Sequence, residues 1–202
     1  MGLLDTILGR SKPVLPDLDR LFGLPAAAIT LQAGAGFAPT GVGSVCFASV
    51  EGGAFARLQE DVRELLDADT GSGGRPVEFS QDAYGYTWLL ARHPAEDTAS
   101  LVNDLHAVNT LLQDAGFGPQ LLCSLMGFHE ATAERALALV YLYKRGTFYP
   151  FAPVPGQAGT TGETGKRDNA TELQIRALLA DDLPIEPDLS RWFPVWGAPG
   201  LG

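Results

Sequence analysis

Histidines are the first residues of this chain whose type could carry chemistry. His93, His106 and His129 could act as general bases or bind zinc. No two of them lie four residues apart, the helical spacing that presents two imidazoles to one zinc ion. We interpret His106, beside an apolar helical stripe, as a hydrogen-bonded structural residue. His129 follows an apolar run and could stand at the end of a strand. The histidine pattern predicts no metal site.

The two cysteines, Cys46 and Cys123, lie in apolar runs. Buried free thiols in a reducing cytoplasm are the simplest interpretation, with a disulfide or a metal pair as the alternative. Neither thiol has an adjacent base in the sequence, and there is no GxSxG nucleophile elbow. A hydrolase that uses His129 or Cys123 is the enzymatic alternative.

Two glycine-rich stretches resemble nucleotide-binding loops incompletely. Gly34-Ala35-Gly36 lacks the third glycine of a dinucleotide loop, because Pro39 holds that position. Gly165-Lys166 resembles the end of a phosphate loop, yet Arg167 stands where the magnesium-binding hydroxyl should follow. We therefore predict a non-enzymatic protein, with no catalytic residue, no cofactor and no metal.

The N-terminal segment could bind a membrane or a partner. Its apolar residues recur at helical spacing and are followed by two cations, so that one face could insert among lipids while the cations meet headgroups. Packing on the chain's own domain, or in a dimer, is the alternative. The residues concerned are Leu3, Leu4, Ile7, Leu8, Arg10 and Lys12.

Aromatic residues gather near the C-terminus, in a proline-flanked segment. Trp192, Phe193 and Trp196 follow one another closely there. Aromatic side chains of this kind can dock into a partner's groove. The alternative is that they fold back onto the core of the same chain, and this is the interpretation we favour.

Charge and composition exclude some classes of protein. The formal net charge of the 202 residues is −10, which disfavours nucleic acid as a partner because phosphate binding needs a basic face. The sequence contains no run of 18 or more apolar residues, so we predict no membrane span. No secretory signal is recognisable. We expect a cytoplasmic protein.

Glycine and proline divide the chain into four predicted parts. Residues 1–16 form the amphipathic segment, 17–155 an α+β core, 156–168 a flexible Gly/Thr-rich linker, and 169–202 a C-terminal helix with the aromatic tail.

Hydrophobic periodicity predicts the elements of the core. We expect strands over residues 28–33, 44–50, 77–80, 84–90, 121–128, 135–144 and 148–154. Helices are expected from 53, over 101–115 with Gly116 as the stop, and from 169, where Asn169 and Glu172 suggest a capping box. From Val42 the order is β-α-β-β-α-β. It predicts a ferredoxin-like core with an antiparallel sheet, plus extra N-terminal and C-terminal strands and helices.

Five blocks of the sequence together resemble one family. They read MGLLDTILGRSKP, ITLQAGAGFAPTGVGSVCF, YGYTWLL, DLHAVNTLLQDAGFGPQLLCSLMGF and LVYLYKRGTFYPFAP, and they cover most of residues 1–154. GVGSVCF, GFGPQLLC and FYPFAP are the most specific parts. The chain resembles the actinobacterial PspA-associated proteins of the PspAB type.

This resemblance implies a role in the phage-shock envelope-stress system, whose central protein is a membrane-bound coiled coil. It implies an adaptor or regulator that contacts a PspA-like or membrane-associated stress protein, with weak peripheral contact at the inner membrane face and homodimerisation as further expectations. It carries over no catalytic residue. A small-molecule-sensing domain that binds its effector at a subunit interface is the alternative.

Overall fold

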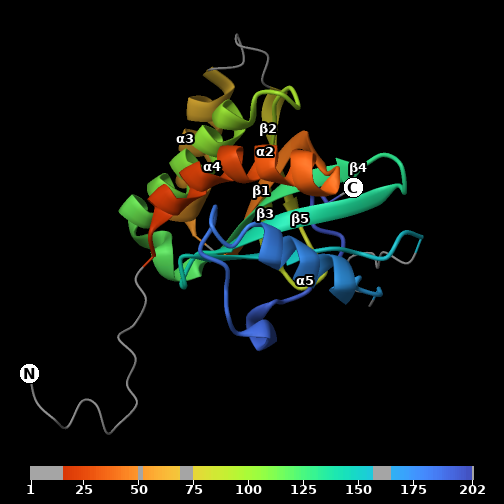
Figure 1. Ribbon diagram of the computed structural model, residues 1–202. Helices are drawn as coiled ribbons and strands as arrows, with labels where there is room; N and C mark the ends of the chain where they lie inside the picture. Colours follow the sequence, from red (N-terminus) through yellow and green to blue (C-terminus); the bar gives the residue numbers. More distant parts are fainter. Residues whose placement is uncertain (1–15, 50–51, 69–74, 157–164, 202) are drawn as a thin grey trace, which may run out of the picture.

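A six-stranded antiparallel sheet forms the centre of the molecule (Figure 1). The computed structural model describes residues 16–49, 52–68, 75–156 and 165–201. The helical elements are η1 (Leu18–Gly23), α2 (Leu24–Ala35), α3 (Gly53–Ala68), α4 (Thr98–Leu112), η3 (Gln113–Phe117), η4 (Gly118–Gln120), α5 (Asn169–Leu178) and η5 (Leu189–Arg191). The strands are β1 (Ala38–Ala48), β2 (Arg75–Gln81), β3 (Tyr86–Arg92), β4 (Leu121–Glu130), β5 (Arg135–Leu142) and β6 (Thr147–Phe151).

The strand order is β2-β3-β1-β4-β5-β6, and every neighbouring pair is antiparallel. The predicted α+β class with an antiparallel sheet is therefore confirmed. Helix α3 connects β1 to β2, and α4 lies between β3 and β4. The complete order is not that of a four-stranded ferredoxin-like sheet, because β5 and β6 extend the sheet beyond β4.

Side chains alternate between the two faces of the sheet, as the pleat requires. On β5, Leu137, Leu139 and Tyr141 join the cluster beneath the helices, while Ala138 and Val140 join a second cluster on the other face. Helices α2 to α5 all contribute to the first cluster. Both faces of the central strands are thus buried, which explains why their sequences read as continuous apolar runs.

Helix α4 follows the predicted pattern closely. Leu101, Leu105 and Val108 are buried against the sheet. The Asp97 carboxylate caps the helix by accepting a hydrogen bond of 3.1 Å from the Ser100 amide. Gly116, with φ of 85°, lies where the helical segment turns toward β4. The position of this helix therefore determines where β4 begins and where the residues that precede Thr98 lie.

The strand predicted over residues 28–33 is wrong, because these residues belong to helix α2. The β-branched pair Ile29-Thr30 suggested a strand, but the surrounding alanines favour a helix and Pro25 is well tolerated in its first turn. The predicted capping box of α5 is also wrong by one residue. Asp168 is the cap, and its carboxylate accepts a hydrogen bond from the Thr171 amide at 3.0 Å.

The C-terminal tail covers the face of the sheet opposite to the helices. Trp192, Ala198 and Leu201 are buried there in the second cluster. At the start of the tail, the Phe148 amide donates to the Pro184 carbonyl and the Glu186 amide donates to the Phe148 carbonyl, at 2.9 and 2.7 Å. These bonds occupy the outer edge of β6, which would otherwise leave unpaired backbone groups.

Candidate functional site

Two of the three aromatic side chains singled out near the C-terminus pack on their own chain. The Trp192 ring stacks on Tyr149 with centroids 6.0 Å apart, and its Nε1 donates to the Glu186 carbonyl at 3.0 Å. Trp196 meets Phe151 edge to face at 4.8 Å. Phe193 differs, because 59% of its surface is exposed. The Phe193 carbonyl nevertheless accepts a hydrogen bond from the Tyr149 hydroxyl at 2.8 Å, so its backbone is held.

A buried ion pair between Arg167 and Glu172 lies beside this tail, because Arg167 Nη1 also donates to the Trp192 carbonyl. Arg167 Nε lies 2.9 Å from Glu172 Oε1, and the Glu172 carboxylate also accepts from the Ala152 amide at 2.9 Å. Burial raises the pKa of Glu172, although the bonds from Arg167 and Ala152 act in the opposite direction. The two ends of the predicted 156–168 linker meet beside this pair, where the Val154 amide donates to the Lys166 carbonyl. Residues 157–164 lie outside the described part of the chain.

Two of the histidines are partly exposed. His106 packs against the Phe22 ring at 4.7 Å and lies 3.5 Å from the exposed Asp19 carboxylate. His129 lies 3.4 Å from the Glu134 carboxylate, and 42% of the His129 side chain is exposed. Six residues along one strand span about 20 Å, so His129 cannot serve as the base for Cys123. Within the described ranges, the side-chain partners of these two histidines are the Asp19 and Glu134 carboxylates and the Phe22 ring.

His93 is the most buried of the three. Its Nε2 lies 2.6 Å from Asp104 Oδ2, and only 8% of the His93 side chain is exposed. A carboxylate can only accept, so Nε2 carries the proton. The other ring nitrogen, Nδ1, is buried and has no hydrogen-bond partner. Buried polar atoms without partners are uncommon, which makes His93 notable.

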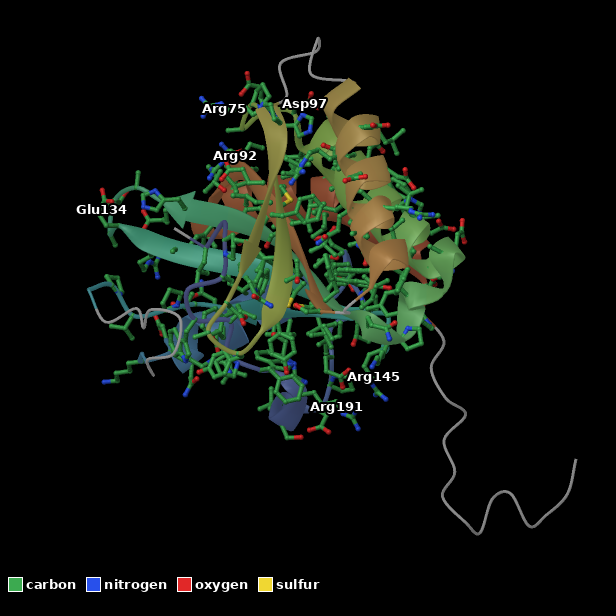
Figure 2. All side chains as sticks on the ribbon, turned by 180° about the vertical axis from the view of Figure 1, so that it is seen from behind. Arg75, Arg92, Asp97, Glu134, Arg145 and Arg191 are labelled. Atoms are coloured by element: carbon green, nitrogen blue, oxygen red, sulfur yellow. The ribbon has the colours of Figure 1, made fainter. Side chains whose placement is uncertain are left out.

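A cavity of about 320 Å³ opens beside His93, at the end of the sheet where β2 begins and β3 ends. Two cations line it. Arg75 and Arg92 lie directly opposite each other on β2 and β3, and Figure 2 shows both at the same end of the sheet. The cavity is lined by Thr40, Gly41, Val42, Arg75, Arg92, His93 and Pro94.

Gly41 sets the shape of this cavity. Its φ is +74°, and an added Cβ would stand only 2.2 Å from the His93 carbonyl oxygen. The His93 amide donates to the Gly41 carbonyl at 2.9 Å. A side chain at position 41 would therefore separate β1 from the residues that carry His93. In the sequence, His93 stands out only as one of three scattered histidines.

The cysteines lie directly opposite each other on β1 and β4. Both are free thiols; Cys46 is buried and Cys123 is partly buried. A hydrogen bond with Cys123, together with burial, raises the pKa of Cys46. A raised pKa suppresses the thiolate, which is the reactive form. The structure therefore assigns Cys46 to the core.

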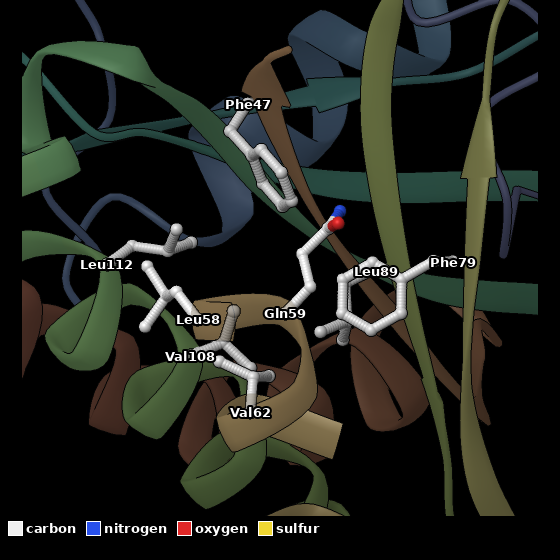
Figure 3. A pocket seen from close by; sticks show the side chains of 8 residues that line it. All are labelled: Phe47, Leu58, Gln59, Val62, Phe79, Leu89, Val108 and Leu112. Carbon is white, nitrogen blue, oxygen red and sulfur yellow. The ribbon is translucent and has the colours of Figure 1, made fainter. Parts of the chain in front are cut away.

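A second, apolar hollow lies between α3 and the sheet (Figure 3). Gln59 is the polar residue of its lining, among side chains that include Phe47, Phe79 and Leu89. Its volume is about 10 Å³, roughly the minimum that holds one water molecule. This hollow has no room for an organic ligand.

Several expectations fall on residues that the structure does not describe. The membrane or partner residues Leu3, Leu4, Ile7, Leu8, Arg10 and Lys12 all lie outside the described residues. Gly34 and Ala35 are the last residues of helix α2 and Gly36 is its C-cap, so these three residues are not a strand-to-helix phosphate loop. Within the described ranges, no three His, Cys, Asp or Glu side chains gather as metal ligands, and no helix is long and apolar enough to cross a bilayer.

The fold and these sites define an α+β protein whose sheet carries helices on one face and its own tail on the other, with a cationic cavity at the end of the sheet. Among known families, the chain matches PspAB, described as PspA associated protein B, over residues 1–200. The chain belongs to this family, which confirms the resemblance seen in the sequence. Neither the curated proteins nor the solved structures contain a match.

Proposed function

We propose that this protein is a non-enzymatic adaptor or regulator in a phage-shock-type envelope stress response, and that it acts by protein–protein contacts near the cytoplasmic membrane face. The family match over residues 1–200 carries this proposal, because the family is described by its association with PspA. The role thus concerns the PspA system, and a PspA-like coiled coil is the partner to test.

The tail offers a contact surface for such a partner. Phe193 and Leu189 expose 59% and 51% of their surfaces. The backbone around them is held by bonds from Tyr149 to the Phe193 carbonyl and from Arg167 to the Trp192 carbonyl. Exposed apolar side chains on a fixed backbone lose little entropy on binding, which favours their use as anchors.

Co-purification from cells at native expression tests the proposal. The wild-type chain should recover a PspA-like coiled-coil protein, and the two purified proteins should then bind directly. Phe193→Ala should weaken this binding about tenfold if Phe193 is an anchor. Tyr84→Ala is the matched control, because Tyr84 is an equally exposed aromatic residue in the β2–β3 hairpin. Failure of the purified proteins to bind each other would contradict the adaptor role.

A peripheral membrane contact through residues 1–12 is part of the same proposal. Deleting these residues should lower the fraction of protein that sediments with vesicles containing anionic lipid. Unchanged sedimentation would contradict the membrane contact but would not bear on the protein–protein contact.

We further infer that β2-β3-β1-β4, with α3 and α4, form a ferredoxin-like unit to which β5 and β6 are added. The antiparallel order of these four strands and the positions of the two helices support it. The alternative function, a small-molecule-sensing domain, draws its support from the cavity beside His93. Such a domain would bind its effector at a subunit interface, so an effector that changes the oligomeric state in sedimentation would favour it.

A further inference from the structure

We propose that the cavity lined by Arg75, Arg92 and His93 binds a phosphate group, either as free phosphate or as a small phosphate monoester. This goes beyond the adaptor function and does not depend on it. Two observations carry the proposal: the pairing of the two arginines, and the cavity that they line.

The pairing of Arg75 with Arg92 places two like charges side by side. The two residues are direct cross-strand partners, and like charges in that position destabilise a sheet. Arg92 Nε lies 3.4 Å from the Glu78 carboxylate, but both side chains are well exposed, so this pair contributes little. Among the described residues Arg75 has no acidic partner. A dianion between the guanidinium groups would turn the repulsion into attraction.

His93 borders the same cavity without offering it a free donor. Its Nε2–H is directed to Asp104, and its Nδ1 is enclosed by the protein. The two guanidinium groups are therefore the groups that would contact an anion. A phosphate dianion offers several oxygens to their paired N–H donors, whereas a carboxylate such as acetate carries one charge and two oxygens. The lining thus favours phosphate over a carboxylate.

The nearby acids already have partners. The Asp104 carboxylate is engaged by His93, and the Asp97 carboxylate caps α4 through the Ser100 amide. Glu78 lies against Arg92 from the exposed side. Among the described residues that line the cavity, none is acidic. Its volume of about 320 Å³ is at the lower end of small-molecule sites and exceeds what inorganic phosphate alone needs.

Calorimetric titration of the full chain with inorganic phosphate and with glycerol 3-phosphate tests the assignment. Both should bind, and phosphate should raise the melting temperature in a concentration-dependent way. Arg75→Gln should weaken binding of either probe at least about tenfold, since it removes a charge-assisted hydrogen-bond donor. The melting temperature of the ligand-free Arg75→Gln variant should stay the same or rise, because the variant removes a repulsion.

Arg57→Gln is the matched control. Arg57 is an exposed cation on α3, the helix that follows the far end of β1, and its loss changes the net charge equally. This variant should bind phosphate as the wild type does. If Arg57→Gln weakened phosphate binding as much as Arg75→Gln does, the loss of net charge alone would explain both results. The proposed site would then be overturned. Acetate binding as tightly as phosphate, or no binding of either phosphate probe, would also overturn the proposal.

Discussion

The Nη1 of Arg167 donates a hydrogen bond of 2.5 Å to the carbonyl oxygen of Trp192. The same guanidinium group pairs with Glu172 and lies over the Phe151 ring at 5.1 Å. One side chain therefore joins helix α5, strand β6 and the tail that covers the second face of the sheet. The position of the tail, and with it that of Phe193, depends on this buried ion pair.

Arg167→Met should destabilise the protein strongly. It leaves the Glu172 carboxylate, which is 3% exposed, without its cation. Removing one partner of a buried pair costs roughly 3 kcal/mol in the free energy of unfolding. Urea denaturation at pH 7 measures the loss. The loss should shrink as the pH falls, because the pKa of Glu172 is already raised and its neutral form needs no cation.

The double variant Arg167→Met/Glu172→Gln is the control for this prediction. An amide at position 172 can still accept the Ala152 hydrogen bond but carries no charge. The double variant should therefore be more stable than Arg167→Met alone. A double variant no more stable than the single one would show that the lost packing on Phe151, rather than the buried charge, is responsible.

Asp168→Ala should remove the cap of α5 and cost about 1 kcal/mol at pH 7. Hydrogen bonds from the Thr171 hydroxyl and amide hold the pKa of Asp168 below its usual 3.8. A lowered pKa stabilises the fold above pH 3.8, and this stabilisation is lost as the pH falls through the folded-state value. The difference between wild type and variant should accordingly vanish in acid. Asp181→Ala, at an exposed acid outside the helix, should leave the stability unchanged.

The sequence predicted the elements whose periodicity is unambiguous. Leu101, Leu105 and Val108 repeat along α4, and the apolar run of β4 could only be a buried strand. Helix α2 was misassigned because its apolar residues show no single stripe: Leu24 and Leu31 are buried while Ile29 is exposed. Tertiary packing on α4 and α5 decides that helix, and local sequence cannot reveal this packing.

The cavity could not be found from spacing in the sequence. Arg75 and Arg92 are 17 positions apart in the chain and meet only through the β2–β3 register. Two tertiary contacts distinguish His93 from the other histidines, and neither is visible in the sequence. Its ring pairs with Asp104 on helix α4, and its backbone lies against Gly41 on β1. The one available signal was the His93-Pro94 step directly before α4, which placed the histidine at a strand end.

Gly41→Ala should be much more disruptive than Gly85→Ala. Both glycines have positive φ, which costs an alanine about 1–2 kcal/mol. At Gly85 an added Cβ meets nothing within 4 Å, whereas at Gly41 it would stand 2.2 Å from the His93 carbonyl oxygen. The Gly41→Ala loss should reach about 3 kcal/mol or more, measured by urea denaturation. Equal losses for the two variants would show that β1 and His93 can separate freely.

Cys46 should resist thiol reagents in the folded protein. Its side chain is only 3% exposed, and its hydrogen bond with Cys123 together with burial raises its pKa, so the reactive thiolate is scarce at pH 8. In a Cys123→Ser variant, the remaining thiol should react with a disulfide reagent at least about a hundredfold more slowly than in urea, following the rare opening of the core. In a Cys46→Ser variant, the remaining thiol is the partly buried Cys123. This thiol should react faster than Cys46 does in the folded protein. Labelling of Cys46 at the unfolded rate would mean that the tail leaves this face of the sheet in solution.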